Sequence, residues 1–97
     1  MIRLDADSLK CAIRPTEFYV LELADMPSPK QTRWNNGGLC PFHDDRKPKT
    51  FYVNVDTGAF KCFSCGSSGG DIISFVQLRH GLSFREALQK LADEWGY

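Results

Sequence analysis

Hydrophobic residues in the first quarter of the chain recur at helical spacing. The pattern predicts one or two helical turns over residues 5–12, with an aspartate as the N-cap. Pro15 suits the first position of a helix, where its missing N–H costs no hydrogen bond, so a second helix is predicted over residues 15–25. The apolar residues expected near one face of this helix are Phe18, Leu21 and Met26, with Val20 and Leu23 beside them. The prolines of residues 27–29 then end the helix and open a linker.

The middle of the chain alternates between apolar and polar residues with the period of two that is typical of a strand. Over residues 49–55 this alternation separates two sets of side chains, one of Phe51, Val53 and Val55 and the other of Thr50, Tyr52 and Asn54. Residues 56–58 indicate a hairpin turn, and residues 59–63 the returning strand. A further strand is expected over residues 33–35, before the turn signal of residues 36–38.

The C-terminal third carries the signals of two helices. Asp71 is a suitable N-cap for an apolar stripe over residues 72–80, and Gly81 suits the left-handed position after its end. Residues 83–86 match a capping box, with serine first and glutamate three positions later. Apolar residues then continue at helical spacing to Trp95, which is expected to pack on the core.

The element order is therefore ααβββαα, an α+β fold in which a small antiparallel sheet is flanked by N- and C-terminal helices. The glycine- and serine-rich run of residues 66–70 lacks the Lys-Ser/Thr pair of a phosphate-binding loop, so it is interpreted as a flexible connector. We expect residues 1–26 to form an N-terminal helical segment and residues 27–97 to form the unit that holds the sheet and the C-terminal helices.

The composition is that of a single folded domain. The chain has 97 residues, of which 42% are apolar and 25% charged. Its longest apolar runs have three or four residues, which excludes a transmembrane helix, and no apolar stretch that could serve as a secretory signal follows the first basic residue. These features predict a cytoplasmic location, where thiols stay reduced, and no membrane partner.

The strongest chemical signal is a pair of ligand motifs. Cys40-Pro41-Phe42-His43 is followed by eighteen residues and then by Cys62-Phe63-Ser64-Cys65. A two-residue gap lets both ligands of a pair reach one ion from a single turn, and the predicted hairpin brings the two pairs together. The alternative is that the cysteines are buried apolar thiols and the histidine a surface residue. Cys11 has no partner motif and is expected to be a small buried or half-buried residue.

Four protein ligands close the coordination shell of a tetrahedral zinc ion, which is typical of a structural site rather than a catalytic one. Three thiolates and a neutral imidazole around a dication also leave a net charge of −1, which makes a poor Lewis acid. The zinc-deaminase motif is not met, because Asp45 stands where that motif has glutamate after the histidine. One structural Zn²⁺ is therefore the expected cofactor, and no catalytic residue is predicted.

Basic and aromatic residues gather in the same part of the chain. The net charge of the whole chain is zero, but residues 27–69 hold six basic and three acidic side chains. Alternation places Lys61 and Phe63 on one sheet face, and cations with flat rings are the groups that bind phosphates and unpaired bases. The candidate nucleic-acid contacts are Arg33, Trp34, Arg46, Lys47, Lys49, Tyr52, Lys61 and Phe63. The alternative is that these rings are core residues and these charges a solvated rim.

Four segments together resemble the N-terminal zinc-binding domain of bacterial and phage-type DNA primases. They are residues 38–43, 61–66, 69–75 and 81–87, which read GLCPFH, KCFSCG, GGDIISF and GLSFREA. The resemblance runs from about residue 33 to the C-terminus and implies a zinc ribbon with zinc on Cys40, His43, Cys62 and Cys65. Where the family usually has Pro-Ser-Phe after the histidine, this chain has the longer Pro48-Lys49-Thr50-Phe51, and residues 1–26 match the family only loosely.

The resemblance implies a module that binds single-stranded template DNA and helps to choose the start site for primer synthesis in DNA replication. The carboxylate cluster that primer synthesis needs for Mg²⁺ is not found in this sequence, so polymerisation is assigned to a primase catalytic domain, with that domain or a replicative helicase as a partner in trans. A second hypothesis is a free-standing zinc-finger adaptor or regulator that docks a protein partner. A third, an enzyme in its own right, has no supporting motif.

Overall fold

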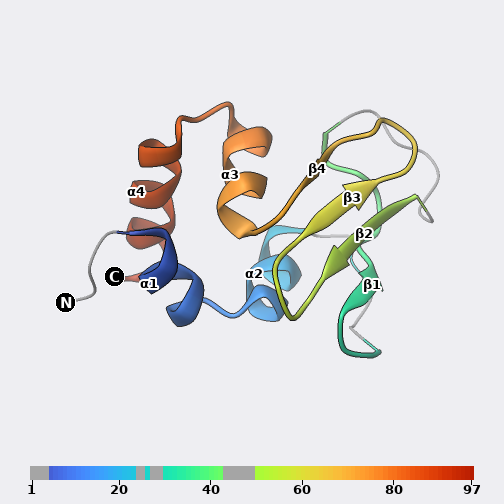
Figure 1. The fold of residues 1–97 in the computed structure, drawn as a ribbon, viewed down its shortest axis with the longest axis horizontal. Helices are drawn as coiled ribbons and strands as arrows, with labels where there is room; N and C mark the ends of the chain where they lie inside the picture. The colour runs from blue at the N-terminus through green and yellow to red at the C-terminus, as the bar shows by residue number, and fades with distance from the viewer. Residues whose placement is uncertain (1–4, 24–25, 27–29, 43–49) are drawn as a thin grey trace.

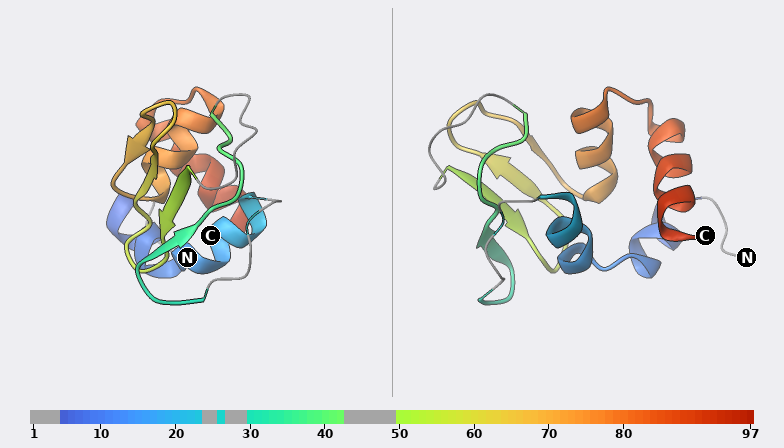
Figure 2. Two further views of the ribbon diagram at one scale, coloured as in Figure 1. Left: turned by 90° about the vertical axis from the view of Figure 1, so that its right-hand side faces the viewer. Right: turned by 180° about the vertical axis from the view of Figure 1, so that it is seen from behind.

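The chain folds into a sheet at one end and helices at the other (Figure 1). In the computed structural model, which describes residues 5–23, 26, 30–42 and 50–97, helices α2 and α3 lie between the sheet and the remaining two helices. Helices α1 and α4 lie at the end of the molecule far from the sheet (Figure 2). The four helices are α1 (Ala6–Ala12), α2 (Pro15–Glu22), α3 (Ile72–His80) and α4 (Phe84–Trp95). The four strands are β1 (Trp34–Asn36), β2 (Phe51–Asn54), β3 (Phe60–Cys62) and β4 (Ser68–Gly69).

The sheet is an antiparallel meander in which every strand pairs with its neighbours in the sequence, in the order β1-β2-β3-β4. This arrangement confirms the α+β class and the predicted hairpin. The interpretation of residues 66–70 as a flexible connector is wrong, because Ser68 and Gly69 form β4 on the free edge of β3. The physical reason is backbone pairing, in which Lys61 lies opposite Ser68 and Phe60 lies opposite Gly69. A two-residue strand of serine and glycine has no apolar–polar alternation in the sequence by which it could be predicted.

The N-terminal helices follow the sequence pattern with two differences. Asp5 caps α1 as expected, accepting a hydrogen bond from the Ser8 N–H at 2.8 Å. Helix α2 ends at Glu22, ahead of the prolines rather than at residue 25. Phe18 and Leu23 are buried as predicted, but Leu21 is 76% exposed and Tyr19 is buried instead, so the predicted apolar face is wrong in part.

Tyr19 replaces Leu21 on the buried face because its hydroxyl finds a partner. That hydroxyl donates to the carbonyl oxygen of Gly58 in the turn between β2 and β3. Burial raises the pKa of Tyr19 well above its usual value, so the proton needed for this hydrogen bond stays in place. The bond ties helix α2 to the sheet hairpin.

The C-terminal helices confirm the predicted caps. The side chain of Asp71 accepts from the Ser74 N–H at 2.8 Å, and Gly81 ends α3 with a φ of +65°. The capping box of α4 is complete, with Ser83 and Glu86 bonding to each other's backbone N–H groups. No helix within the described ranges is both long and apolar enough to cross a membrane.

An aromatic cluster joins the sheet to the helices. Phe75 of α3 is fully buried, and its ring centroid lies 5.2–5.6 Å from those of four other rings, which belong to Phe18, Tyr19, Phe42 and Phe60. The Trp95 ring stacks on Phe18 with a centroid distance of 6.4 Å, as expected for a core contact. These contacts fix the orientation of the sheet relative to the helices.

Gly69 is a position where the packed fold leaves no space for a side chain. A Cβ atom there would lie 2.5 Å from Cε1 of the buried Phe60 and 2.8 Å from Cβ of Ser74. We expect Gly69→Ala to lower the free energy of unfolding by about 1–3 kcal/mol, the usual cost of overpacking. Urea unfolding of the zinc-loaded protein measures it. Gly70→Ala is the matched control, because an added Cβ at Gly70 meets no described atom within 4 Å; equal stability of the two variants would contradict the expectation.

Candidate metal centre and nucleic-acid interface

Three cysteines from two distant segments of the chain meet at one point. Cys40 follows the turn after β1, Cys62 is the last residue of β3, and Cys65 lies in the turn that follows. Their three Sγ atoms all lie within 4.8 Å of one another, and those of Cys40 and Cys65 are 3.8 Å apart. This separation suits thiolates that share one ion.

Glycines shape the two turns that carry these cysteines. Gly38 and Gly66 have φ angles of +83° and +81°, in the left-handed region that only glycine adopts at little cost. The Asn36 side chain accepts from the Gly38 N–H at 2.7 Å, and the Gly66 N–H donates to the Cys62 carbonyl at 2.9 Å. The chain thus turns tightly just before one cysteine and just after another.

The electrostatics of the cluster suit a dication. Burial raises the pKa of the Cys40 thiol to about 12. The pKa of the Cys65 thiol is lowered to about 6, chiefly by its hydrogen bond with the Ser67 side chain. This exposed thiol therefore ionises readily. Ionising the buried thiols of Cys40 and Cys62 is costly without a positive charge beside them, and thiolate sulfur is a ligand that zinc prefers. The described residues therefore fit a structural zinc ion, which would hold the two turns together.

Each sulfur also has a hydrogen-bonding group beside it. The Phe42 N–H donates to Cys40 Sγ at 3.5 Å, Thr50 Oγ1 lies 4.0 Å from Cys62 Sγ, and Ser67 Oγ lies 3.2 Å from Cys65 Sγ. The sequence motifs did not point to Thr50 or Ser67 for this role. The available signal was a hydroxyl residue two positions after the last cysteine of the motif.

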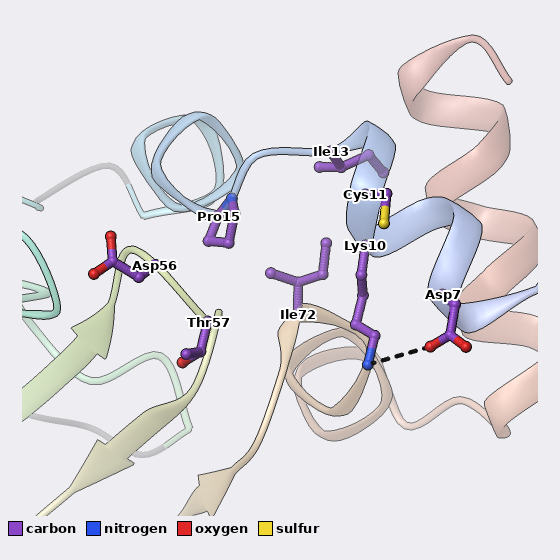
Figure 3. A pocket seen from close by; sticks show the side chains of 8 residues that line it. All are labelled: Asp7, Lys10, Cys11, Ile13, Pro15, Asp56, Thr57 and Ile72. Carbon is purple, nitrogen blue, oxygen red and sulfur yellow. Dashed lines mark ion pairs between the residues drawn. The ribbon is translucent and has the colours of Figure 1, made fainter.

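The other sequence-predicted residues divide into two groups. His43, Arg46, Lys47 and Lys49 lie outside the described residues. Cys11 was expected to be buried or half-buried, and this is wrong: it is exposed, because Leu9 and Ile13 occupy the buried face of α1 and its C-cap. Cys11 lines a pocket of about 330 Å³ between the N-terminal helices, the β2–β3 turn and α3, where Lys10 and Asp7 form an ion pair at 4.0 Å (Figure 3).

A second cavity lies on the sheet face opposite the core. It has a volume of about 260 Å³ and is lined by four of the predicted residues, which are Trp34, Tyr52, Lys61 and Phe63. Strand register brings them together: Tyr52 lies opposite Lys61 of β3, and Trp34 of β1 lies opposite Asn54, two residues along β2 from Tyr52. The alternation of Tyr52 and Lys61 with buried neighbours is as the sequence indicated.

The rings of this cavity are available for contact. Phe63 is 67% exposed, its ring meets that of Tyr52 edge to face at 5.9 Å, and Lys61 Nζ lies 5.2 Å from its centroid. Arg33 is exposed and adopts a φ of +65°, with its backbone N–H donating to Asp56, and it does not line the cavity. We call Trp34, Tyr52, Lys61 and Phe63 the aromatic surface.

Comparison with known proteins places these features in a family. The family model described as the CHC2 zinc finger matches residues 27–97. A DNA primase of Mycolicibacterium smegmatis is 50% identical over 60 residues, which are 62% of this chain and 9% of that primase. A DNA primase of Thermotoga maritima is 48% identical over 58 residues, which are 60% of this chain and 10% of that primase. The chain thus spans about a tenth of the length of these curated relatives.

A solved structure extends the likeness to the N-terminal helices. The Aquifex aeolicus primase (zinc binding and RNA polymerase domains) superimposes with a TM-score of 0.70 and 34% sequence identity, covering 93% of this chain and 21% of that one. The family match and the cysteine cluster confirm structural zinc as the cofactor, and the superposition confirms the zinc-ribbon fold. The chain belongs to the CHC2 zinc finger family.

Proposed function

We propose that this chain is a primase-type zinc module that binds single-stranded template DNA on the aromatic surface. Zinc is held by Cys40, His43, Cys62 and Cys65, and it keeps the sheet rigid. The observation that carries the proposal is the cavity formed by three rings and one lysine on an exposed sheet face. Residues 1–26 and 27–97 are proposed as the helical segment and the zinc-binding domain of the module.

The cavity suits an unpaired base. Stacking of a base on an aromatic ring contributes about 1–3 kcal/mol and is tolerant of base identity, because every base has a flat face. Lys61 Nζ, 5.2 Å from the Phe63 centroid, is placed to meet a phosphate of the nucleotide whose base enters the cavity. A paired base offers only its edge, so the surface favours single strands over duplex.

The relatives supply the context of this activity. They are DNA primases, and the solved relative also has an RNA polymerase domain. We propose that this chain contributes template recognition beside a primase catalytic domain, with that domain or a replicative helicase as a partner in trans, in cytoplasmic DNA replication. Arg33, Arg46, Lys47 and Lys49 are proposed as further phosphate contacts.

Oligonucleotide titration at several salt concentrations tests the proposal. Loss of one phosphate contact lowers the slope of log affinity against log salt by about 1, and this is expected for Lys61→Ala. Phe63→Ala is expected to weaken binding by about 1–3 kcal/mol, a factor of about 5–150, with little change in slope, because stacking is uncharged.

Matched controls use exposed residues outside the aromatic surface. Arg79→Ala removes an exposed cation of α3, and Phe84→Ala removes an exposed ring of α4. Both should bind as the parent chain does. Equal affinity of Lys61→Ala, Phe63→Ala and the controls would contradict the proposal. If oligonucleotide affinity does not depend on salt and the chain forms a tight complex with a host protein, the adaptor hypothesis is supported instead.

A further inference from the structure

Ser67 stands beside the most solvent-accessible sulfur of the cysteine cluster. Cys40 and Cys62 are buried, whereas Cys65 is exposed and is the sulfur that water or a competing chelator reaches first. Ser67 Oγ lies 3.2 Å from Cys65 Sγ, the shortest of the three hydrogen-bond distances to the cluster's sulfurs described above. The hydroxyl therefore acts at the point where a metal site would be easiest to open.

The position of Ser67 is set by the sheet. Its carbonyl accepts from the Cys62 N–H at 2.8 Å, so its backbone is tied to the strand that carries a neighbouring cysteine. The next residue, Ser68, pairs with Lys61 as the start of β4. Because the Ser67 carbonyl and Ser68 are both fixed by backbone pairing, the hydroxyl is held near Cys65 Sγ in the folded domain.

We propose that Ser67 is a positioning residue for the zinc ion, whose hydroxyl donates to the Cys65 thiolate and holds it toward the metal. The inference rests on the ligand assignment under the proposed function. Three thiolates and a neutral imidazole around Zn²⁺ carry a net charge of −1, and a hydrogen bond to sulfur offsets part of that excess. Groups of this kind typically change metal affinity by about 10–100-fold.

Zinc affinity of the 97-residue chain, measured by competition with a chromophoric chelator, tests the inference. Ser67→Ala is expected to bind zinc about 10–100-fold more weakly. Ser67→Thr keeps a hydroxyl and should restore most of the affinity. Ser64→Ala is the matched control, since Ser64 is an exposed serine next to Cys65, and it should bind zinc as the parent chain does.

The spectrum of the cobalt-substituted protein separates this inference from the ligand assignment. In Ser67→Ala the thiolate-to-cobalt absorption should keep its intensity at saturating cobalt, because all three sulfurs still bind. Unchanged zinc affinity in Ser67→Ala would overturn the role of the hydroxyl. Zinc affinity reduced equally in Ser67→Ala and Ser67→Thr would also overturn it. Undiminished thiolate absorption in Cys65→Ser would instead overturn the ligand assignment itself.

Discussion

Cys62→Ser is expected to yield a chain that retains no zinc and has no folded sheet. Cys62 is fully buried at the end of β3, where its sulfur meets those of Cys40 and Cys65. Structural zinc contributes about 10–16 kcal/mol to folding in small zinc peptides, whereas a whole domain is typically stable by only about 5–15 kcal/mol. Loss of the ion therefore removes more free energy than the sheet and helices are expected to supply.

Elemental analysis and circular dichroism measure this result. The parent chain should hold one zinc per molecule and should lose its β signal when a strong chelator removes the ion. Cys11→Ser is the matched control, because Cys11 is an exposed thiol of α1 remote in sequence from the cluster. Native circular dichroism of Cys62→Ser, or of the chelated parent chain, would show that the ion does not hold the fold.

The second large effect is expected at the centre of the aromatic cluster. Phe75→Ala removes a fully buried ring that touches two residues of α2 and one of β3. Phenylalanine-to-alanine changes in cores cost about 3–5 kcal/mol, through lost transfer free energy and the cavity that remains. Because a small domain has little stability in reserve, the zinc-loaded variant should unfold at a much lower urea concentration.

Two further variants make this expectation specific. Phe75→Leu keeps part of the volume and should lose less stability than Phe75→Ala. Phe84→Ala removes a ring that is 50% exposed, and it should change the free energy of unfolding by about 0.5 kcal/mol or less. Similar urea midpoints for Phe75→Ala and Phe84→Ala would mean that the ring cluster does not join the sheet to the helices.

Local signals account for the parts of the fold that the sequence predicts well. The caps at Asp71 and Ser83 involve residues three positions apart, and the β2 alternation is visible within one strand. Features set by distant contacts were missed. Tyr19 is buried because its hydroxyl bonds to a carbonyl 39 positions away, and β4 exists because the edge of β3 lies beside it.

The same distinction applies to the candidate site. Cysteine spacing predicts the cluster, and period-two alternation predicts that Tyr52 and Lys61 share an exposed face. Neither pattern shows that Trp34 of β1 joins them, since this depends on the register of two strands separated by a long loop. The role of Ser67 depends on a side-chain distance that the sequence alone does not give.

The two ends of the molecule are closed by different kinds of contact. Strands of the meander pair with their neighbours in the sequence, whereas the Tyr97 hydroxyl donates to the Ala12 carbonyl across 85 positions and α1 packs on α4. Loop-closure entropy rises with the length of chain enclosed, so re-forming the helical end after it opens costs more than re-forming a hairpin. Amide protons of α1 should therefore exchange through a partial opening that leaves the sheet, and the surface on it, intact.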